Sequence, residues 1–197
     1  MTTIKYLKKQ LEANIQKVCK IDNGEIKLRY DLTIGDVMNL KSVESAINNI
    51  LVVAQTCAFA DTFNDKSIKD GIKHNISNPN AKGFDVKYPK TGGARVFAEL
   101  KATVPCENNG TQYGSNQKKS IYKDLENLLG LSDKGKNENI TPNDEKYMVL
   151  IDIKGQQQAF DNLRKPDTYD QSKICVVHID PNTEIAQYDK YGWQEKI

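Results

Sequence analysis

The sequence predicts an α/β protein whose mixed central β-sheet is flanked by helices. Three observations predict this class: segments with helical periodicity come first, two strand-like segments joined by a short turn follow, and a further helix leads to an apolar run of strand length. Strands joined by a tight turn pair antiparallel, whereas a strand reached through a helix pairs parallel, so the sheet should be mixed. No repeat or linker divides the chain. We therefore expect one domain over residues 1–197 with its core at about 40–155.

Two helices are expected before the sheet. Residues 3–19 carry apolar side chains at helical spacing, namely Ile4, Leu7, Leu11, Ile15 and Val18. Residues 24–34 alternate well enough for a short strand or hairpin arm. Residues 40–63 are periodic, and their second half is apolar nearly all round, which is typical of a buried helix. The polar residues 64–82 are expected to be a loop.

The middle of the chain changes from helical to strand periodicity. Two strands are expected at 83–89 and 94–105, because the sequence between them has the residues of a tight turn. A loop then leads to a helix over 116–129, which Ser115 would cap and Gly130 would end. After a second loop to about residue 144, the last two strands are expected at 147–153, buried on both faces, and at 173–179.

The overall charge does not select a partner. The 28 Lys and Arg against 26 Asp and Glu give a net charge of +2, so nucleic-acid binding would need a segregated basic surface. The four cysteines, at 19, 57, 106 and 175, lack metal-binding spacing and are expected to be reduced thiols. We see no secretion signal and no apolar stretch of about 18 residues, and we expect a cytoplasmic protein with no membrane partner.

Three charged residues of the expected hairpin could do chemistry together. Glu99 and Lys101 are two residues apart in a strand, so their side chains share one face of the sheet. Asp85 lies on the preceding strand, across a turn near Thr91 and Gly92, where it can approach Glu99. Two carboxylates are hard oxygen ligands for Mg²⁺, and a neighbouring lysine can orient or deprotonate an attacking water. The trio therefore suits metal-dependent hydrolysis of a phosphodiester.

This trio resembles a known nuclease motif. Asp85, 13 further residues and then Glu99-Leu100-Lys101 are similar to the motif of the PD-(D/E)xK nuclease superfamily, and the order of elements over about 40–155 resembles its restriction endonuclease-like core. The resemblance implies a type II restriction endonuclease, a Mg²⁺-dependent homodimer that cuts double-stranded DNA at a short sequence and leaves 5′-phosphate and 3′-hydroxyl ends. It also implies a DNA methyltransferase in the same genome that protects the host DNA.

The resemblance assigns a role to each residue of the motif. Lys101 corresponds to the catalytic lysine. The metal ligands would be Asp85, Glu99, the backbone carbonyl of Leu100 and, because some members add a glutamate from the preceding helix, Glu44. One departure is that Phe84 stands where many members have proline.

Residues that could contact DNA follow the second strand of the hairpin. The expected helix begins with Asn116, Gln117, Lys118 and Lys119, and a helix N-terminus with lysines can hold a phosphate. Asn109 and Gln112 lie in the loop before this helix, where their amides could read adenine edges in the major groove. The three glutamines at 156–158 invite the same hypothesis.

Other interpretations of these residues stay open. Glu99 and Lys101 could belong to a solvated strand face with a cross-strand ion pair, although Phe97 shares that face. Asp152 and Lys154 form a rival Asp-x-Lys pair at a strand end. As functions, the alternatives are a structure-specific repair nuclease or junction resolvase of the same superfamily, and a catalytically inactive DNA-binding module.

Overall fold

The computed structural model describes residues 9, 11–16, 19–22, 25–28, 33–74, 76, 83–90, 93–152, 155–163, 170 and 173–183. The chain forms two compact units. One comprises Met1–Ala54 and Glu184–Ile197, and the other comprises Gln55–Thr183. Helix α2 (Ile34–Asp61) contributes residues to both units.

The N-terminal unit contains a short hairpin and the first part of α2. Residues 11–16 are helical, and β1 (Cys19–Asp22) pairs antiparallel with β2 (Glu25–Leu28). The helix expected through residue 19 is wrong at its end, since Cys19 begins β1. The Asn-Gly dipeptide between the strands is the sequence typical of a tight hairpin, and it explains why strand pairing replaces helix there.

Helix α2 begins at Ile34 rather than near residue 40 because a reciprocal cap starts it. The Thr33 Oγ1 accepts a hydrogen bond from the Asp36 N–H at 3.2 Å, and the Asp36 carboxylate accepts one from the Thr33 N–H at 2.9 Å. An 18-residue window of α2 has a mean hydropathy of 1.2, enough by length and composition for a membrane span, and 44% of that window is buried within the protein. The absence of a membrane partner therefore stays a prediction.

The second unit, Gln55–Thr183, is an α/β structure with a four-stranded mixed sheet. The strand order is β3 (Val86–Pro89), β4 (Arg95–Lys101), β5 (Glu145–Ile151) and β6 (Cys175–Ile179). β3 pairs antiparallel with β4, whereas β4 with β5 and β5 with β6 pair parallel. The predicted hairpin, the crossover to a parallel strand and the mixed sheet are thus confirmed.

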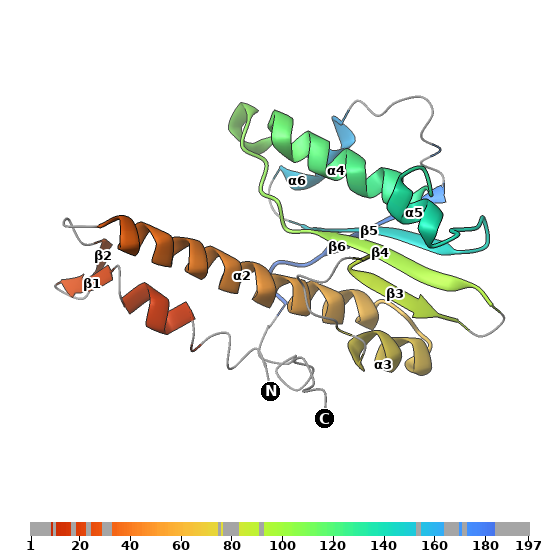
Figure 1. Cartoon of the computed structure of the whole chain (residues 1–197), viewed down its shortest axis with the longest axis horizontal. Helices are drawn as coiled ribbons and strands as arrows, with labels where there is room; N and C mark the ends of the chain where they lie inside the picture. The colour runs from red at the N-terminus through yellow and green to blue at the C-terminus, as the bar shows by residue number, and fades with distance from the viewer. Residues whose placement is uncertain are drawn as a thin grey trace. The chain divides into compact units, whose positions relative to one another are not determined.

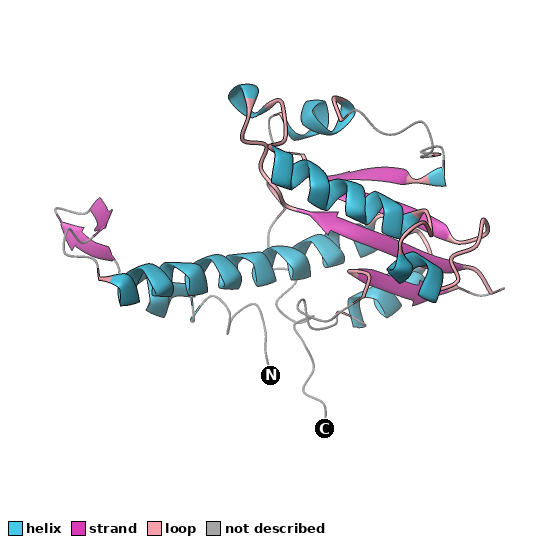
Figure 2. Cartoon of the chain, turned by 45° about the horizontal axis from the view of Figure 1, so that its top comes forward, coloured by secondary structure: helices cyan, strands magenta, loops and turns pink. Residues whose placement is uncertain are grey.

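Helices cover both faces of this sheet (Figures 1 and 2). On one face, α4 (Ser115–Leu128) buries its apolar side chains in the main core together with strand residues. That core includes Phe97, Tyr113, Ile121, Leu125, Leu128, Met148, Leu150 and Phe160. On the other face, Phe59 near the end of α2 meets Tyr147 of β5, with ring centroids 5.1 Å apart. The second half of α2 is therefore a buried helix, as its sequence predicts.

Four short helices were not predicted; the first three lie where loops were expected, and the fourth lies in a segment to which no element was assigned. They are α3 (Lys66–His74), the 3-10 turn η1 (Asn108–Gly110), α5 (Asp133–Asn137) and α6 (Gln156–Asp161). Side-chain caps start two of them: the Asp65 carboxylate accepts from the Ser67 N–H at 2.8 Å, and the Ser132 hydroxyl accepts from the Gly135 N–H at 3.1 Å. Helices this short show too few turns for periodicity to reveal them.

Two expected boundaries around β4 and α4 are also corrected. β4 ends at Lys101 rather than at residue 105. α4 begins with Ser115 itself, so the N-cap position falls on Gly114 and Ser115 is not the cap. The Gln117 side chain accepts a hydrogen bond from the Gly114 N–H at 2.9 Å and completes this start.

Candidate functional site

The β3–β4 hairpin brings Asp85 and Glu99 together. The register pairs Val86 with Ala98, which places Asp85, the residue before β3, next to Glu99. The Asp85 carboxylate accepts a hydrogen bond of 2.7 Å from the Leu100 N–H. This contact fixes one Asp85 oxygen to the backbone of β4.

Glu99 is buried beneath the helices of this sheet face. The residue is 4% exposed, and its Oε1 accepts hydrogen bonds from Asn127 Nδ2 at 3.1 Å and from Lys134 Nζ at 2.6 Å. Asn127 is itself oriented, because its Oδ1 accepts from the Ser132 hydroxyl at 2.7 Å. Oε2 of Glu99 makes no hydrogen bond with any residue that the structure describes.

A close approach of two helices creates this arrangement. Gly135, beside Lys134 in α5, lies against the end of α4, and a Cβ at this position would stand 2.5 Å from the Asn127 backbone oxygen. Any larger residue would push α5 outward and carry Lys134 with it. The glycine therefore helps to set the Lys134 ammonium on the Glu99 carboxylate.

Lys101 is held by two side chains of α4. Its ammonium donates to the Ser120 hydroxyl at 3.1 Å and forms an ion pair with Asp124. Ser120 and Asp124 are four residues apart and so share one helix face. Lys101 thus lies on the same side of the sheet as Glu99, between β4 and the middle of α4.

The surroundings of Glu99 and Asp124 oppose the ionisation of both carboxyl groups. Burial, followed by the charges of Asp85 and Asp124, raises the pKa of Glu99 to about 8 even though Lys134 opposes the shift. The pKa of Asp124 is also raised, first by burial and further by Asp85, against the effect of Lys101. Three carboxylates therefore face two ammonium groups.

This donor set fits a hard divalent cation. Carboxylate oxygens are the ligands that Mg²⁺ prefers, and a cation would offset the burial and the neighbouring carboxylate charges that raise the pKa of Glu99. Within the described part of the chain, no three His, Cys, Asp or Glu side chains form a ready-made metal cage. Mg²⁺ commonly binds through one or two carboxylates and keeps several waters, so Asp85 and Glu99 suffice as side-chain ligands.

The two other candidates for metal chemistry lie apart from this cluster in the chain. Glu44 is exposed on α2 and belongs to the N-terminal unit. Asp152 follows β5, is exposed, and donates its backbone N–H to the Ile179 carbonyl at 2.7 Å. Its proposed partner Lys154 lies outside the described residues, so the rival Asp-x-Lys pair stays a hypothesis.

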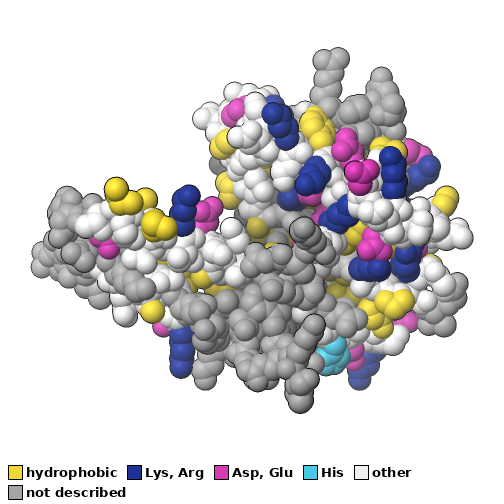
Figure 3. Space-filling view, in the orientation of Figure 1, with side chains coloured by type: hydrophobic (Ala, Val, Ile, Leu, Met, Phe, Trp, Pro, Cys, Tyr) yellow, Lys and Arg dark blue, Asp and Glu magenta, His cyan; other side chains and the backbone are white. Residues whose placement is uncertain are grey.

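The predicted DNA-contacting residues occupy the start of α4 and the loop before it. Asn116, Lys119 and Asn109 are exposed, and Lys118 and Gln112 are half-buried. The Gln117 amide is already used within the protein, since it donates to the Val104 carbonyl at 2.8 Å and caps α4. Lys and Arg side chains alternate with Asp and Glu over the α4–α5 surface, so this face is not uniformly basic (Figure 3).

Sequence reasoning missed the residues that surround the motif, namely Ser120, Asp124, Asn127 and Lys134. The spacing of Ser120 and Asp124 on one helix face was visible. What the sequence did not reveal is that this face points at Lys101. Lys134 and Asn127 depend on the close approach of α5, a helix of five residues without periodicity.

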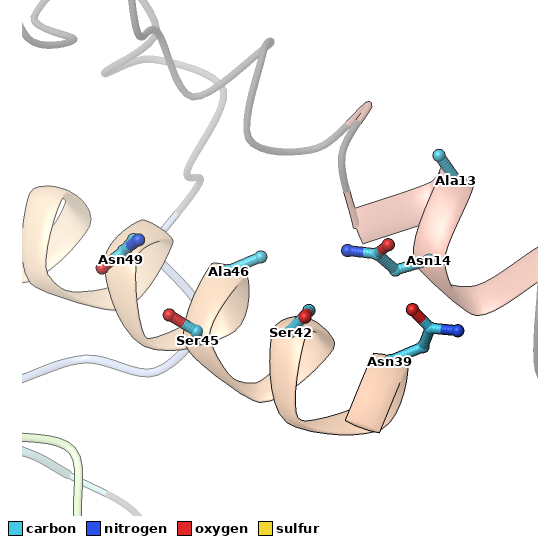
Figure 4. Close-up of a pocket in the computed structure, with 7 residues that line it drawn as sticks. All are labelled: Ala13, Asn14, Asn39, Ser42, Ser45, Ala46 and Asn49. Atoms are coloured by element: carbon cyan, nitrogen blue, oxygen red, sulfur yellow. The ribbon is translucent and has the colours of Figure 1, made fainter. Parts of the chain in front are cut away.

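A separate polar groove of about 450 Å³ lies in the N-terminal unit, between residues 11–16 and α2 (Figure 4). Small uncharged side chains line it: Ala13, Asn14, Asn39, Ser42, Ser45, Ala46 and Asn49. None of the residues predicted for catalysis or metal binding lines the groove. We do not assign it to the candidate site.

Comparison with family models, with curated proteins and with solved structures gave no match. Function must accordingly be argued from the chemistry of the site rather than from relatives.

Proposed function

We propose that the chain is a Mg²⁺-dependent endonuclease that hydrolyses phosphodiester bonds of double-stranded DNA. The observation that carries the proposal is the placement of Asp85, Glu99 and Lys101 on one face of the β3–β4 hairpin, where burial and the neighbouring carboxylates raise the pKa of Glu99. A merely solvated strand face would not bury Glu99 to 4% exposure. Strongly perturbed carboxylates beside a lysine are typical of functional sites.

The residues of the cluster have distinct tasks in this proposal. Asp85 and Glu99 would hold the metal ion, which when bound polarises a phosphate and makes a water more acidic. The Leu100 N–H fixes Asp85, and Asn127 orients Glu99 through Oε1. The Lys101 ammonium offsets the negative charge that develops on the phosphate, and it can transfer a proton at Nζ.

The finer proposal is a type II restriction enzyme with a restriction endonuclease-like core. It would leave 5′-phosphate and 3′-hydroxyl ends and act as a homodimer in the cytoplasm, since one centre per subunit is needed for each DNA strand. A DNA methyltransferase in the same genome would protect the host. Glu44 and the Leu100 carbonyl are the further metal ligands that this proposal assigns.

A second candidate is a DNA-binding module that has lost catalysis. The ion pairs of Glu99 with Lys134 and of Lys101 with Asp124 favour it, because they give both motif residues a partner within the protein. Such buried pairs can be purely structural. The two candidates differ in one outcome, which is cleavage.

Cleavage of supercoiled plasmid in millimolar Mg²⁺ tests the proposal. We expect the wild-type chain to nick and linearise the plasmid, and Lys101→Ala to lose this activity. Lys87→Ala is the matched control, because Lys87 is an exposed lysine of β3 that pairs with Glu138 rather than with the cluster. Full activity of Lys101→Ala would contradict the proposal, and DNA binding without cutting by the wild type would support the second candidate.

The pattern of cleavage products and the preferred DNA substrate distinguish between the classes of nuclease. Discrete fragments indicate a restriction enzyme, whereas a smear indicates a less specific nuclease. A preference for branched over linear duplexes would indicate a structure-specific repair nuclease or junction resolvase.

A further inference from the structure

Two amide-rich segments, far apart in the sequence, meet at one place in the fold. The loop before α4 contains η1, and α6 begins at Gln156. Their backbones touch: a Cβ at Gly155 would stand 2.2 Å from the Gly110 backbone oxygen. In addition, Asn162 Nδ2 donates to the Thr111 carbonyl at 3.3 Å. The loop and α6 therefore form one continuous surface.

Side-chain amides dominate this surface. We call it the amide surface and define it by Asn108, Asn109, Gln112, Gln157, Gln158 and Asn162. All six are exposed except Gln112, which is half-buried. Apart from Asn162, their side-chain amides make no hydrogen bond with another described residue. They are thus available to a ligand that offers paired donors and acceptors.

The loop that carries three of these amides has a defined conformation. Asn108, Asn109 and Gly110 all have positive φ, at 47°, 55° and 83°, and Asn and Gly are the residues that tolerate this region best. The Thr111 hydroxyl donates to the Asn108 carbonyl at 2.8 Å, and Glu107 and Gln112 form a β-bridge across the turn. A loop held in this way presents its amides without a large cost in entropy on binding.

The amide surface lies at the same sheet edge as the candidate catalytic lysine. β4 and β5 are parallel, so the loop after Lys101 and the helix after Ile151 leave the sheet at one edge. Ser120, the partner of Lys101, lies in the second turn of α4, the helix that directly follows this loop.

The chemistry of the surface favours base edges of duplex DNA over unpaired bases. Asn and Gln amides match the N6 and N7 groups of adenine in a bidentate manner. Unpaired bases are usually held by stacking on exposed aromatic rings. The aromatic residues of these two segments, Tyr113 and Phe160, are buried at 0% and 3% exposure. Lys119, exposed at the start of α4, can contact the adjacent phosphates.

We propose that the amide surface reads adenine-containing base pairs through the major groove and so sets the sequence preference of the chain. The assignment rests on the proposed function in that it takes duplex DNA as the substrate. It adds α6 to the recognition surface and states the class of base pair that is read.

Selection from a randomised duplex library tests this assignment. The full chain is incubated, with Ca²⁺ in place of Mg²⁺, with duplexes randomised over about ten base pairs, one helical turn. The bound duplexes are then sequenced. We expect the wild type to enrich A·T pairs at fixed positions. The double variant Asn109→Gly, Gln157→Ala should lose this preference by about five- to one-hundred-fold at one position or more. Glycine keeps the positive φ at position 109 while it removes the amide.

A matched control separates recognition from general loss of binding. Asn137→Ala removes an exposed amide of α5, outside the amide surface, and should leave the selected sequences unchanged. A wild-type pool without fixed A·T positions, or the same pool from the double variant, would overturn the assignment. Mg²⁺ is then added to the selected duplexes. If the wild type selects A·T positions but does not cut these duplexes, only the nuclease proposal is contradicted. If the double variant cuts them and selects the same sequences as the wild type, only the assignment of the amide surface is contradicted.

Discussion

The two ends of β4 carry charge clusters with opposite properties. At the start of the strand, the Arg95 guanidinium makes a bidentate contact with Asp144, with Nε–Oδ1 and Nη2–Oδ2 distances of 3.1 and 2.7 Å. Burial opposes ionisation of Asp144, but hydrogen bonds from Arg95 and Thr141 outweigh it and lower its pKa to about 2. At the end of the strand, the pKa of Glu99 is raised to about 8.

The difference separates a cluster whose charges the protein satisfies from the one that we propose binds a metal ion. Arg95 also donates to the Glu138 and Asn139 carbonyls, each at 2.8 Å, so the first cluster is fully satisfied by the protein. In the second cluster, burial and the charges of Asp85 and Asp124 outweigh the effect of Lys134 and oppose ionisation of Glu99. Natural proteins tolerate such local conflict mainly at functional sites.

The largest expected effect on stability comes from the Arg95–Asp144 cluster at the start of β4. Arg95→Met removes the cationic partner of buried Asp144, which keeps its hydrogen bonds from Thr141, and we expect the free energy of unfolding to fall by about 3 kcal/mol. Urea denaturation followed by circular dichroism measures this. DNA cleavage per folded molecule should be unchanged, because Arg95 lies at the other end of β4. Loss of cleavage in the folded variant would show that the two clusters are not separate.

A smaller effect is expected from the lysine on Glu99. Lys134→Met removes a hydrogen bond to a buried carboxylate and should cost about 1–2 kcal/mol without metal. Because the ammonium competes with a cation for Glu99, Mg²⁺ should raise the melting temperature of this variant more than that of the wild type. Lys136→Met, at an exposed position of the same helix, is the control. Equal Mg²⁺ shifts in all three proteins would argue against a metal site at Glu99.

A further effect concerns the pH dependence of stability. Because the folded pKa of Glu99 is about 8, above the ordinary carboxyl value of 4.5, the folded state binds more protons between these values, and stability falls as pH rises. The slope from one group is at most about 1.4 kcal/mol per pH unit. Glu99→Gln should remove this contribution, so its stability relative to the wild type should increase from pH 5 to 8 in metal-free buffer. Parallel stability curves would show that the pKa of Glu99 is not raised.

The sequence predicted the β3–β4 hairpin more completely than the side chains that contact Glu99. Alternation and the turn residues were enough to define the two strands, and the turn then determined that Asp85 approaches Glu99. Asn127 and Lys134 could not be foreseen, because they reach Glu99 only when α5 folds back on α4 around Gly135. Local patterns report periodicity, whereas the docking of a short helix depends on tertiary contacts.

The first residues of α2 and α3 were also difficult to predict from the apolar pattern of the sequence. The Thr33–Asp36 cap of α2 is visible in the sequence once it is sought, but the alternating residues before it favoured a strand through residue 34. α3 was hidden by its polar composition, although Ile68 and Ile72 are spaced by one helical turn and both are buried. In each case a capping side chain carried more information than the apolar pattern.

Cleavage of supercoiled plasmid by Glu99→Gln and by Arg95→Met, in millimolar Mg²⁺ and at a temperature where both variants are folded, tests the central claim most directly. Glutamine keeps the size of the side chain and removes its charge. We predict that Glu99→Gln cuts at least about one hundred-fold more slowly than the wild type, while Arg95→Met cuts at the wild-type rate. Wild-type cleavage by Glu99→Gln would contradict the assignment of this cluster as a metal-dependent nuclease centre.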